Sequence, residues 1–223
     1  MNYKPRWNYT HKIVNCLMKI NAAKDIVDIL NLPIDLEEKL KKESIYKTVH
    51  YSTKIEGNAI ELSQVNEIIE NRIKSDTKDA QEIRNYYNAL LFLDGEAKAH
   101  KSITEDFIKK LHGIIEIIKT GRRSEKSSFR DGQNVIKSSR GNSIVYLPPE
   151  AKDIGGLMKS LVEWIEKEEN VEIPVPILAA IASYQFVTIH PFWDGNGRTA
   201  RALATYILKR GGYDLKGFYS MEE

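Results

Sequence analysis

The chain has 223 residues, and 33 Lys and Arg against 31 Asp and Glu give a formal net charge of +2. This near balance argues against a protein whose main task is to coat nucleic acid or an anionic membrane. A hydrophobic fraction of 42% beside 29% charged residues is typical of a folded domain with one sizeable core and argues against intrinsic disorder.

The single cysteine, Cys16, can form no internal disulfide, so composition favours a reducing compartment, and we expect a cytoplasmic protein. No apolar run reaches the length of a membrane span, and residues 1–10 carry no apolar segment typical of an export signal. We therefore expect neither a membrane nor a nucleic acid among the direct partners.

Apolar residues recur at spacings of three and four along most of the chain, which predicts a mainly helical protein. The predicted helices span residues 11–46 with a break at Pro33, then 62–73, 83–93, 104–118, 154–165 and about 175–188. Asp35 and Thr104 are candidate N-caps, because their side chains can accept hydrogen bonds from free amides of a first turn. The helix at 175–188 is apolar on most faces, so we expect it at the centre of the domain.

Residues 121–149 have a different character, with many Gly, Ser, Asn and Arg and only short apolar runs. Val135-Ile136 and Ile144–Tyr146 flank a Gly141-Asn142 turn, which predicts a β-hairpin over about residues 133–147. The fold class predicted from the sequence is therefore all-α with one short β-hairpin.

The segment His190–Arg201 follows the helix at 175–188 and precedes another apolar helical run. It is therefore predicted to be a loop that leads into a helix N-terminus, where unsatisfied N–H groups attract anions such as phosphate. Gly195 and Gly197 allow a ligand to approach the backbone closely. Arg198 and Arg201 are three residues apart, so both could reach one polyphosphate.

Two further side chains in this loop suit phosphate chemistry. Asp194 offers an oxygen ligand of the kind that Mg²⁺ takes alongside waters and phosphate oxygens. His190 offers a near-neutral imidazole that could accept a proton from an attacking hydroxyl. A lone His before a Pro is usually structural, and a Gly-Asn-Gly loop by itself is often only a turn. A base, a metal carboxylate, a glycine loop and two arginines within twelve residues together indicate a functional site.

His190–Arg201 resembles the signature of the Fic family, His-Pro-Phe-x-[Asp/Glu]-Gly-Asn-Gly-Arg-x-x-Arg, without a departure. The resemblance implies a helical Fic core over residues 51–218 behind an N-terminal helical extension at 1–50. It also implies a protein adenylyltransferase, which transfers AMP from ATP to a Ser, Thr or Tyr hydroxyl of a target protein and releases pyrophosphate. By this resemblance His190 is the base, Asp194 binds Mg²⁺, Gly195, Asn196 and Gly197 line the phosphate site, and Arg198 and Arg201 hold the β- and γ-phosphates. The related Doc-type kinases typically have Lys at the position of Gly197, so this glycine favours nucleotidyl transfer.

Upstream, the segment 52–57 resembles the inhibitory motif of the family, [Ser/Thr]-x-x-x-Glu-[Gly/Asn], through Ser52, Glu56 and Gly57. Ser52 and Glu56 lie one helical turn apart, and a glutamate carboxylate can pair with an arginine. We expect Glu56 to pair with Arg198 and so to keep the γ-phosphate of ATP from its productive position.

The hairpin resembles the Fic flap, which implies that a target segment pairs along its edge and presents its hydroxyl to His190. Val135, Ile136 and Lys137 are the flap residues expected near the nucleotide. The eleven tyrosines offer acceptor sites for self-modification.

Two other hypotheses fit the same residues. In one, the enzyme removes AMP from a modified protein, and Glu56 positions or activates the attacking water. In the other, the protein is a non-catalytic nucleotide-binding interaction module that uses ATP only to change shape. His190 argues against this module, because phosphate binding alone requires no base.

Overall fold

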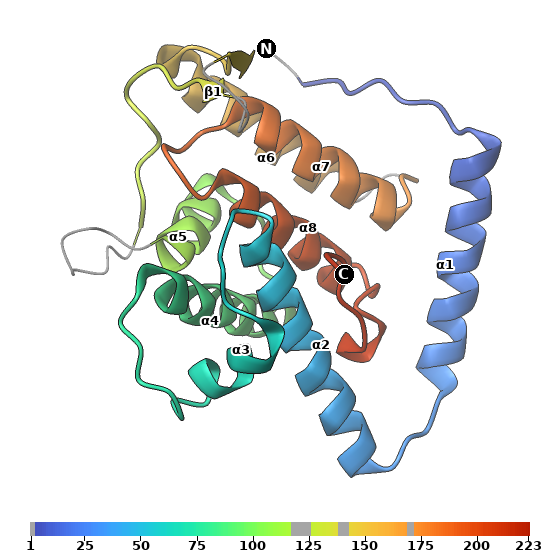
Figure 1. Ribbon diagram of the computed structural model, residues 1–223. Coiled ribbons are helices and arrows are strands. Elements are labelled where there is room, and N and C mark those ends of the chain that lie inside the picture. Colours follow the sequence, from blue (N-terminus) through green and yellow to red (C-terminus); the bar gives the residue numbers. More distant parts are fainter. Residues whose placement is uncertain (1–2, 117–125, 138–142, 169–171) are drawn as a thin grey trace.

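The computed structural model describes residues 3–116, 126–137, 143–168 and 172–223. In this part of the chain a mainly helical body carries one two-stranded antiparallel sheet, so the predicted fold class is confirmed (Figure 1). The elements are α1 (His11–Ile29), α2 (Ile34–Lys54), α3 (Leu62–Ile69), α4 (Lys78–Lys98), α5 (Glu105–Ile115), β1 (Ile136–Lys137), β2 (Ile144–Tyr146), α6 (Ala151–Glu168), α7 (Val175–Ile189), α8 (Asn196–Arg210) and the short 3₁₀ turn η1 (Leu215–Gly217).

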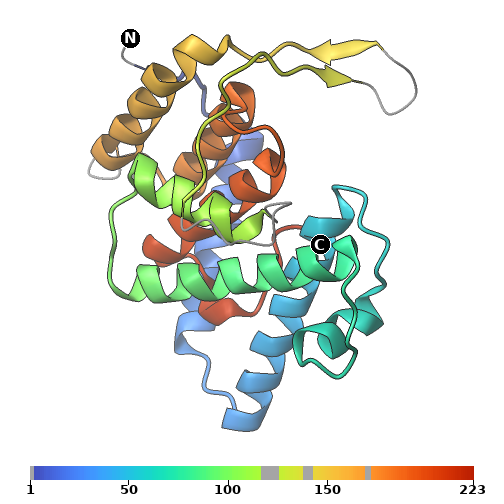
Figure 2. The ribbon, with the colours of Figure 1, turned by 90° about the vertical axis from the view of Figure 1, so that its left-hand side faces the viewer.

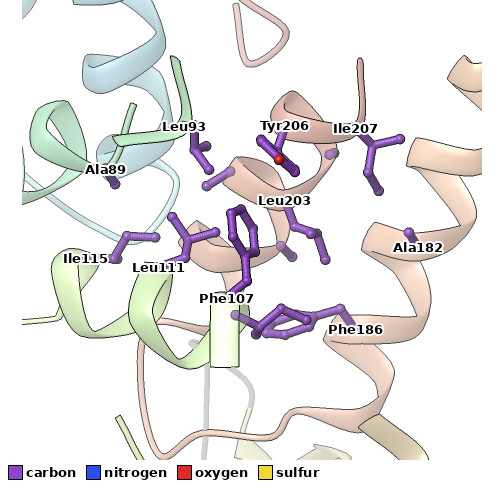
Figure 3. Packing of buried hydrophobic residues seen from close by; sticks show 14 of the residues in the cluster. Ala89, Leu93, Phe107, Leu111, Ile115, Ala182, Phe186, Leu203, Tyr206 and Ile207 are labelled. Carbon is purple, nitrogen blue, oxygen red and sulfur yellow. The ribbon is translucent and has the colours of Figure 1, made fainter. Parts of the chain in front are cut away.

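The central element is α8, which packs against α7 on one side and against α4 and α5 on the other. Figure 3 shows Leu203 and Tyr206 of α8 among apolar side chains from these neighbouring helices. Three alanines of α8 are almost fully buried, and their small side chains allow the surrounding helices to approach closely. The prediction that the helix at 175–188 is central is wrong, because α7 leaves Tyr184 73% exposed.

Helix ends follow local hydrogen bonding. Thr104 caps α5 as predicted, because its hydroxyl accepts from the backbone N–H of Phe107 at 3.0 Å. Asp35 is not a cap: α2 begins directly after Pro33, and Asp35 lies in the first turn, where its charge complements the helix dipole. In the described residues α5 ends at Ile115, before the end predicted for the helix at 104–118. Residues 117–118 of that prediction lie outside the described residues.

The hairpin projects beyond the helical body, as Figure 2 shows. Ile136 pairs with Tyr146 and Lys137 with Ile144, with a register irregularity between the two pairs. The predicted turn at residues 141–142 lies outside the described residues. Tyr146 donates its hydroxyl hydrogen bond to the Thr188 carbonyl at 2.8 Å, so β2 is attached to the end of α7.

The two N-terminal helices differ in how they contact the body. None of the residues of α1 is buried, and this helix stands at one edge of the molecule (Figure 1). In contrast, α2 packs against α3 and α4, and the Ser44 hydroxyl donates to the Tyr219 carbonyl at 2.5 Å. The predicted boundary between residues 50 and 51 falls inside α2. Within the described ranges, no helix combines the length and the apolar character that crossing a bilayer requires.

We expect Leu203→Ala to lower the free energy of unfolding by about 3 kcal/mol, because truncation leaves a cavity beside fully buried neighbours in the centre of the core. Leu91→Ala is the matched control, since Leu91 is 45% exposed and its truncation should cost less than about 1 kcal/mol. Urea unfolding followed by circular dichroism measures both. Equal losses in the two variants would contradict the central position of α8.

Candidate active site

The signature loop connects α7 to α8 and is held by its own residues. His190 ends α7 with left-handed backbone angles, φ 51° and ψ 59°, and Pro191 follows it. The Asn196 side chain accepts from the Phe192 N–H at 3.0 Å and donates to the Phe192 carbonyl at 2.8 Å. The Asn196 side chain therefore stabilises the loop. The group of Asn196 that can face an anion is its backbone N–H, in the first turn of α8.

A buried ring stack supports the loop from below. The Phe192 ring stacks on His112 of α5 with centroids 3.6 Å apart. His112 Nε2 lies 2.9 Å from the Asp194 carbonyl, which can only accept, so Nε2 carries the proton and Nδ1 accepts from the Ser127 hydroxyl at 2.7 Å. Burial lowers the pKa of His112 to about 4, which keeps the ring neutral. The Asp194 carboxylate is fixed in turn by the Gly195 N–H at 2.7 Å.

Arg201 joins α8 to the end of α2. Its Nε donates to the Ser52 hydroxyl at 2.8 Å, and its Nη2 donates to the Ser52 carbonyl and to Glu56 Oε1, each at 2.8 Å. The structure thus brings the segment 52–57 to the signature, but the partner expected for Glu56 is wrong: it pairs with Arg201 instead of Arg198. The reason is that Arg198 is directed toward α4 and α5, on another side of α8.

Two glycines make room for this contact. A side chain at Gly197 would collide with the Glu56 carboxylate, so the approach of Glu56 to α8 requires glycine there. Gly57 has φ +95°, a conformation that favours glycine, and it forms the turn that leads the chain away after Glu56.

Arg198 is only 4% exposed and is enclosed by two carboxylates. Its Nη2 lies 2.7 Å from Glu116 Oε1, and its Nη1 lies 3.5 Å from Glu82 Oε1. Burial raises the pKa of Glu116, while Arg198 opposes this rise. A side chain at Gly195 would also collide with Glu116, so this carboxylate lies against the loop that begins α8. Sequence reasoning missed Glu116 and Glu82, because neither belongs to a motif and only the packing of α4 and α5 brings them to Arg198.

His190 lies half-buried between the loop and the base of the hairpin. Burial lowers its pKa, and the positive charge of Arg130 lowers it further, whereas the carboxylates of Glu56 and Asp194 act in the opposite direction. The net direction favours a neutral imidazole, the form that can accept a proton.

The hairpin begins beside the signature loop. Asn134 donates from its side-chain amide to the Trp193 carbonyl at 3.2 Å. The three flap residues predicted near the nucleotide come directly after this contact: Val135 and Ile136 are half-buried, and Lys137 is exposed. Their contact with a nucleotide stays a prediction.

Asp194 fits the Mg²⁺ predicted from the sequence. Its carboxylate is exposed, and the Gly195 N–H holds it in one orientation. In the part of the chain that the structure describes, no group of three metal-binding side chains is present. A single carboxylate is nevertheless suitable for Mg²⁺ bound together with a nucleotide, because Mg²⁺ keeps waters and takes phosphate oxygens as its other ligands.

Similarity to known proteins indicates the family of this chain. Residues 102–208 match the family model described as Fic/DOC family. A protein adenylyltransferase Fic from Drosophila willistoni is 33% identical over 205 residues, which are 88% of this chain and 38% of that protein. A second protein adenylyltransferase Fic, from Drosophila mojavensis, is 29% identical over 205 residues, again 88% of this chain and 38% of that protein. The chain thus spans less than two fifths of the length of these curated relatives.

Solved structures give the same result for the fold. A Fic family protein from Desulfovibrio desulfuricans G20 superposes with a TM-score of 0.78 at 28% identity, covering 96% of this chain and 62% of that one. A Fic domain containing signaling protein from Bacteroides thetaiotaomicron gives a TM-score of 0.76 at 24% identity, covering 88% and 73%. The helical body with its hairpin and signature loop is thus a Fic fold. The chain is a Fic family protein.

We expect the stability of the wild-type protein to fall as the pH drops from about 6.5 to about 4. A free histidine titrates near pH 6.5 but folded His112 only near 4, so the unfolded state binds more protons between these values. The contribution reaches up to about 3 kcal/mol. In His112→Gln this part of the pH dependence should disappear, as urea unfolding at a series of pH values would measure. Parallel pH profiles for the two proteins would contradict a neutral buried ring.

Proposed function

We propose that the protein is a Mg²⁺-dependent protein adenylyltransferase, which transfers AMP from ATP to a hydroxyl side chain of a target protein and is inhibited by its own Glu56. The observation that carries this proposal is the convergence on the N-terminus of α8 of a half-buried neutral imidazole, an oriented carboxylate and an arginine that Glu56 occupies. The names of the curated relatives support the reaction class.

In the proposed reaction, the target hydroxyl attacks the α-phosphorus of ATP and its proton passes to His190. The bond from the α-phosphorus to the bridging oxygen breaks, and pyrophosphate leaves. Mg²⁺ held at Asp194 would supply positive charge to the phosphate oxygens. The first-turn amides of α8 would stabilise negative charge on the phosphates, so the protein contributes mainly positioning and electrostatics.

In the inhibited state, the Glu56 carboxylate pairs with the Arg201 guanidinium, which a terminal phosphate of ATP would otherwise bind. The Arg201 guanidinium donates to both Ser52 and Glu56, so a phosphate that takes the place of Glu56 must displace its carboxylate. The Glu56 side chain is 37% exposed, which leaves it free to be displaced without unfolding the core.

We expect Glu56→Gly to raise the labelling of proteins by α-labelled ATP at least about tenfold, because one charge-assisted hydrogen bond of about 1.4 kcal/mol no longer competes with the phosphate. His190→Ala in the Glu56→Gly protein should abolish labelling while Mg²⁺·ATP still binds in calorimetry. Labelling that Glu56→Gly leaves unchanged would contradict inhibition by Glu56. Tight ATP binding without any label transfer would instead favour the non-catalytic module.

We expect Glu116→Gln to tighten the binding of Mg²⁺·ATP, since the variant leaves Arg198 with more net positive charge beside the α8 N-terminus. Glu82 still contacts Arg198, so the guanidinium remains paired and the fold is kept. Calorimetry would compare the variant with Glu105→Gln, a substitution at the far end of α5. Weaker binding in Glu116→Gln would mean that Glu116 orients Arg198 for the phosphate rather than competing with it.

The placement of Glu56 also favours one second candidate, removal of AMP from a modified protein. Its carboxylate is near enough to His190 to influence the imidazole pKa, so it could orient a water for attack on an AMP–protein bond. The assay that separates the two functions uses as its substrate a target protein to which the Glu56→Gly variant has attached AMP. Release of AMP by the wild-type protein, but not by Glu56→Gly, would assign hydrolysis to Glu56.

A further inference from the structure

Arg130 occupies the junction of the hairpin and the signature loop. Its Nε donates to the His190 carbonyl at 2.9 Å, and its backbone N–H donates to the Pro191 carbonyl at 2.9 Å. Its two terminal nitrogens donate to the carbonyls of Gly132, at 2.6 Å, and Pro149, at 2.5 Å. Gly132 precedes β1 and Pro149 follows β2, so one guanidinium joins both ends of the hairpin to the backbone of His190.

Further contacts hold the same junction tightly. A side chain at Gly132 would come within 2.9 Å of the Trp193 ring, so the start of the hairpin lies directly against the signature loop. The hydrogen bonds from Asn134 to the Trp193 carbonyl and from Tyr146 to the Thr188 carbonyl lie on either side of this contact.

The environment of Arg130 is unusual for a buried charge. The residue is 2% exposed, and the hydrogen-bond partners of its guanidinium among the described residues are carbonyl oxygens, with no carboxylate. Burial without a counter-ion is costly and lowers the pKa of the group. A planar fork of five N–H donors suits several carbonyls at once, which a lysine ammonium cannot match in geometry.

We propose that Arg130 is a positioning residue that sets the hairpin and the His190 backbone in one fixed arrangement, so that a target segment on the hairpin presents its hydroxyl to the imidazole. This inference rests on the proposed function, and it adds a residue outside the signature, the inhibitory motif and the hairpin strands. His190 has a left-handed backbone conformation, and its carbonyl is the group that Arg130 binds. Loss of the guanidinium therefore removes the hydrogen bonds that join both ends of the hairpin to the backbone of the catalytic histidine, and the other contacts at the junction must hold the arrangement alone.

The activity test uses the full chain with Glu56→Gly, to which Arg130→Gln or Arg130→Lys is added. We expect Arg130→Gln to lower kcat for a saturating protein target by about 100-fold, the cost of misplacing reacting groups by about 1 Å. The Kd of Mg²⁺·ATP should stay within about threefold, because Arg130 contacts none of the phosphate-site residues around α8. Arg130→Lys should recover part of kcat, since it keeps the charge but not the three-way geometry.

Arg210→Gln is the matched control for a lost arginine. Arg210 of α8 is also largely buried and donates to the Lys101 carbonyl and to Glu166, far from the signature loop. We expect this variant to lose stability in urea unfolding but to keep kcat. Equal losses of kcat in the Arg130 and Arg210 variants, at temperatures where both are folded, would overturn a positioning role.

Hydrogen exchange tests the same inference without activity. Arg130→Gln, but not Arg210→Gln, should speed amide exchange in β1 and β2. If Glu56→Gly labels no protein, the proposed function fails. The hydrogen-exchange measurement still decides in that case whether Arg130 positions the hairpin. Unchanged exchange in the hairpin of Arg130→Gln, or unchanged kcat in an active background, would overturn the inference.

Discussion

The buried position of α8 is the constraint on which the site depends. Because this helix packs against α7, α4 and α5, its N-terminus is fixed at the point where the chain leaves α7. The loop between them must therefore turn sharply, and it does so through the left-handed His190, the glycine cap at Gly195 and the Asn196 brace. The first-turn amides at the end of this packed helix are the groups that the proposed phosphate site would use.

The two arginines of the signature have different roles in this state. Arg201 faces the end of α2, where Ser52 and Glu56 hold it, and Glu56 remains partly exposed. Arg198 lies deeper and is paired with Glu116 and Glu82. The partly exposed pair of Arg201 and Glu56 is the easier of the two to separate, because water can solvate its charges. The buried pair is harder to break, because separating its charges would leave one of them uncompensated in a low-dielectric interior.

Comparison of the sequence-based predictions with the structure shows where pattern reasoning succeeds. Regular apolar spacing located the helices, and Thr104 was identified as a cap, because both signals act within a few residues. The helix ends were predicted less well, since α2 continues to Lys54 and α3 ends at Ile69. The central position was assigned to the wrong helix. Uniform apolarity suggested α7, but small alanines and neighbours on several sides make α8 central. Arg130 stood out in no motif, because its three carbonyl partners come together only in the folded chain.

The sequence by itself determined the helical fold with its hairpin, the family, and the twelve-residue loop that begins α8, since each depends on local spacing or on a contiguous motif. Tertiary structure alone decided which carboxylate meets which arginine. Glu56, Glu82 and Glu116 come from three segments far apart in the chain, and their distances to α8 depend on how α2, α4 and α5 pack around it. Spacing along one helix cannot report contacts that packing between helices creates.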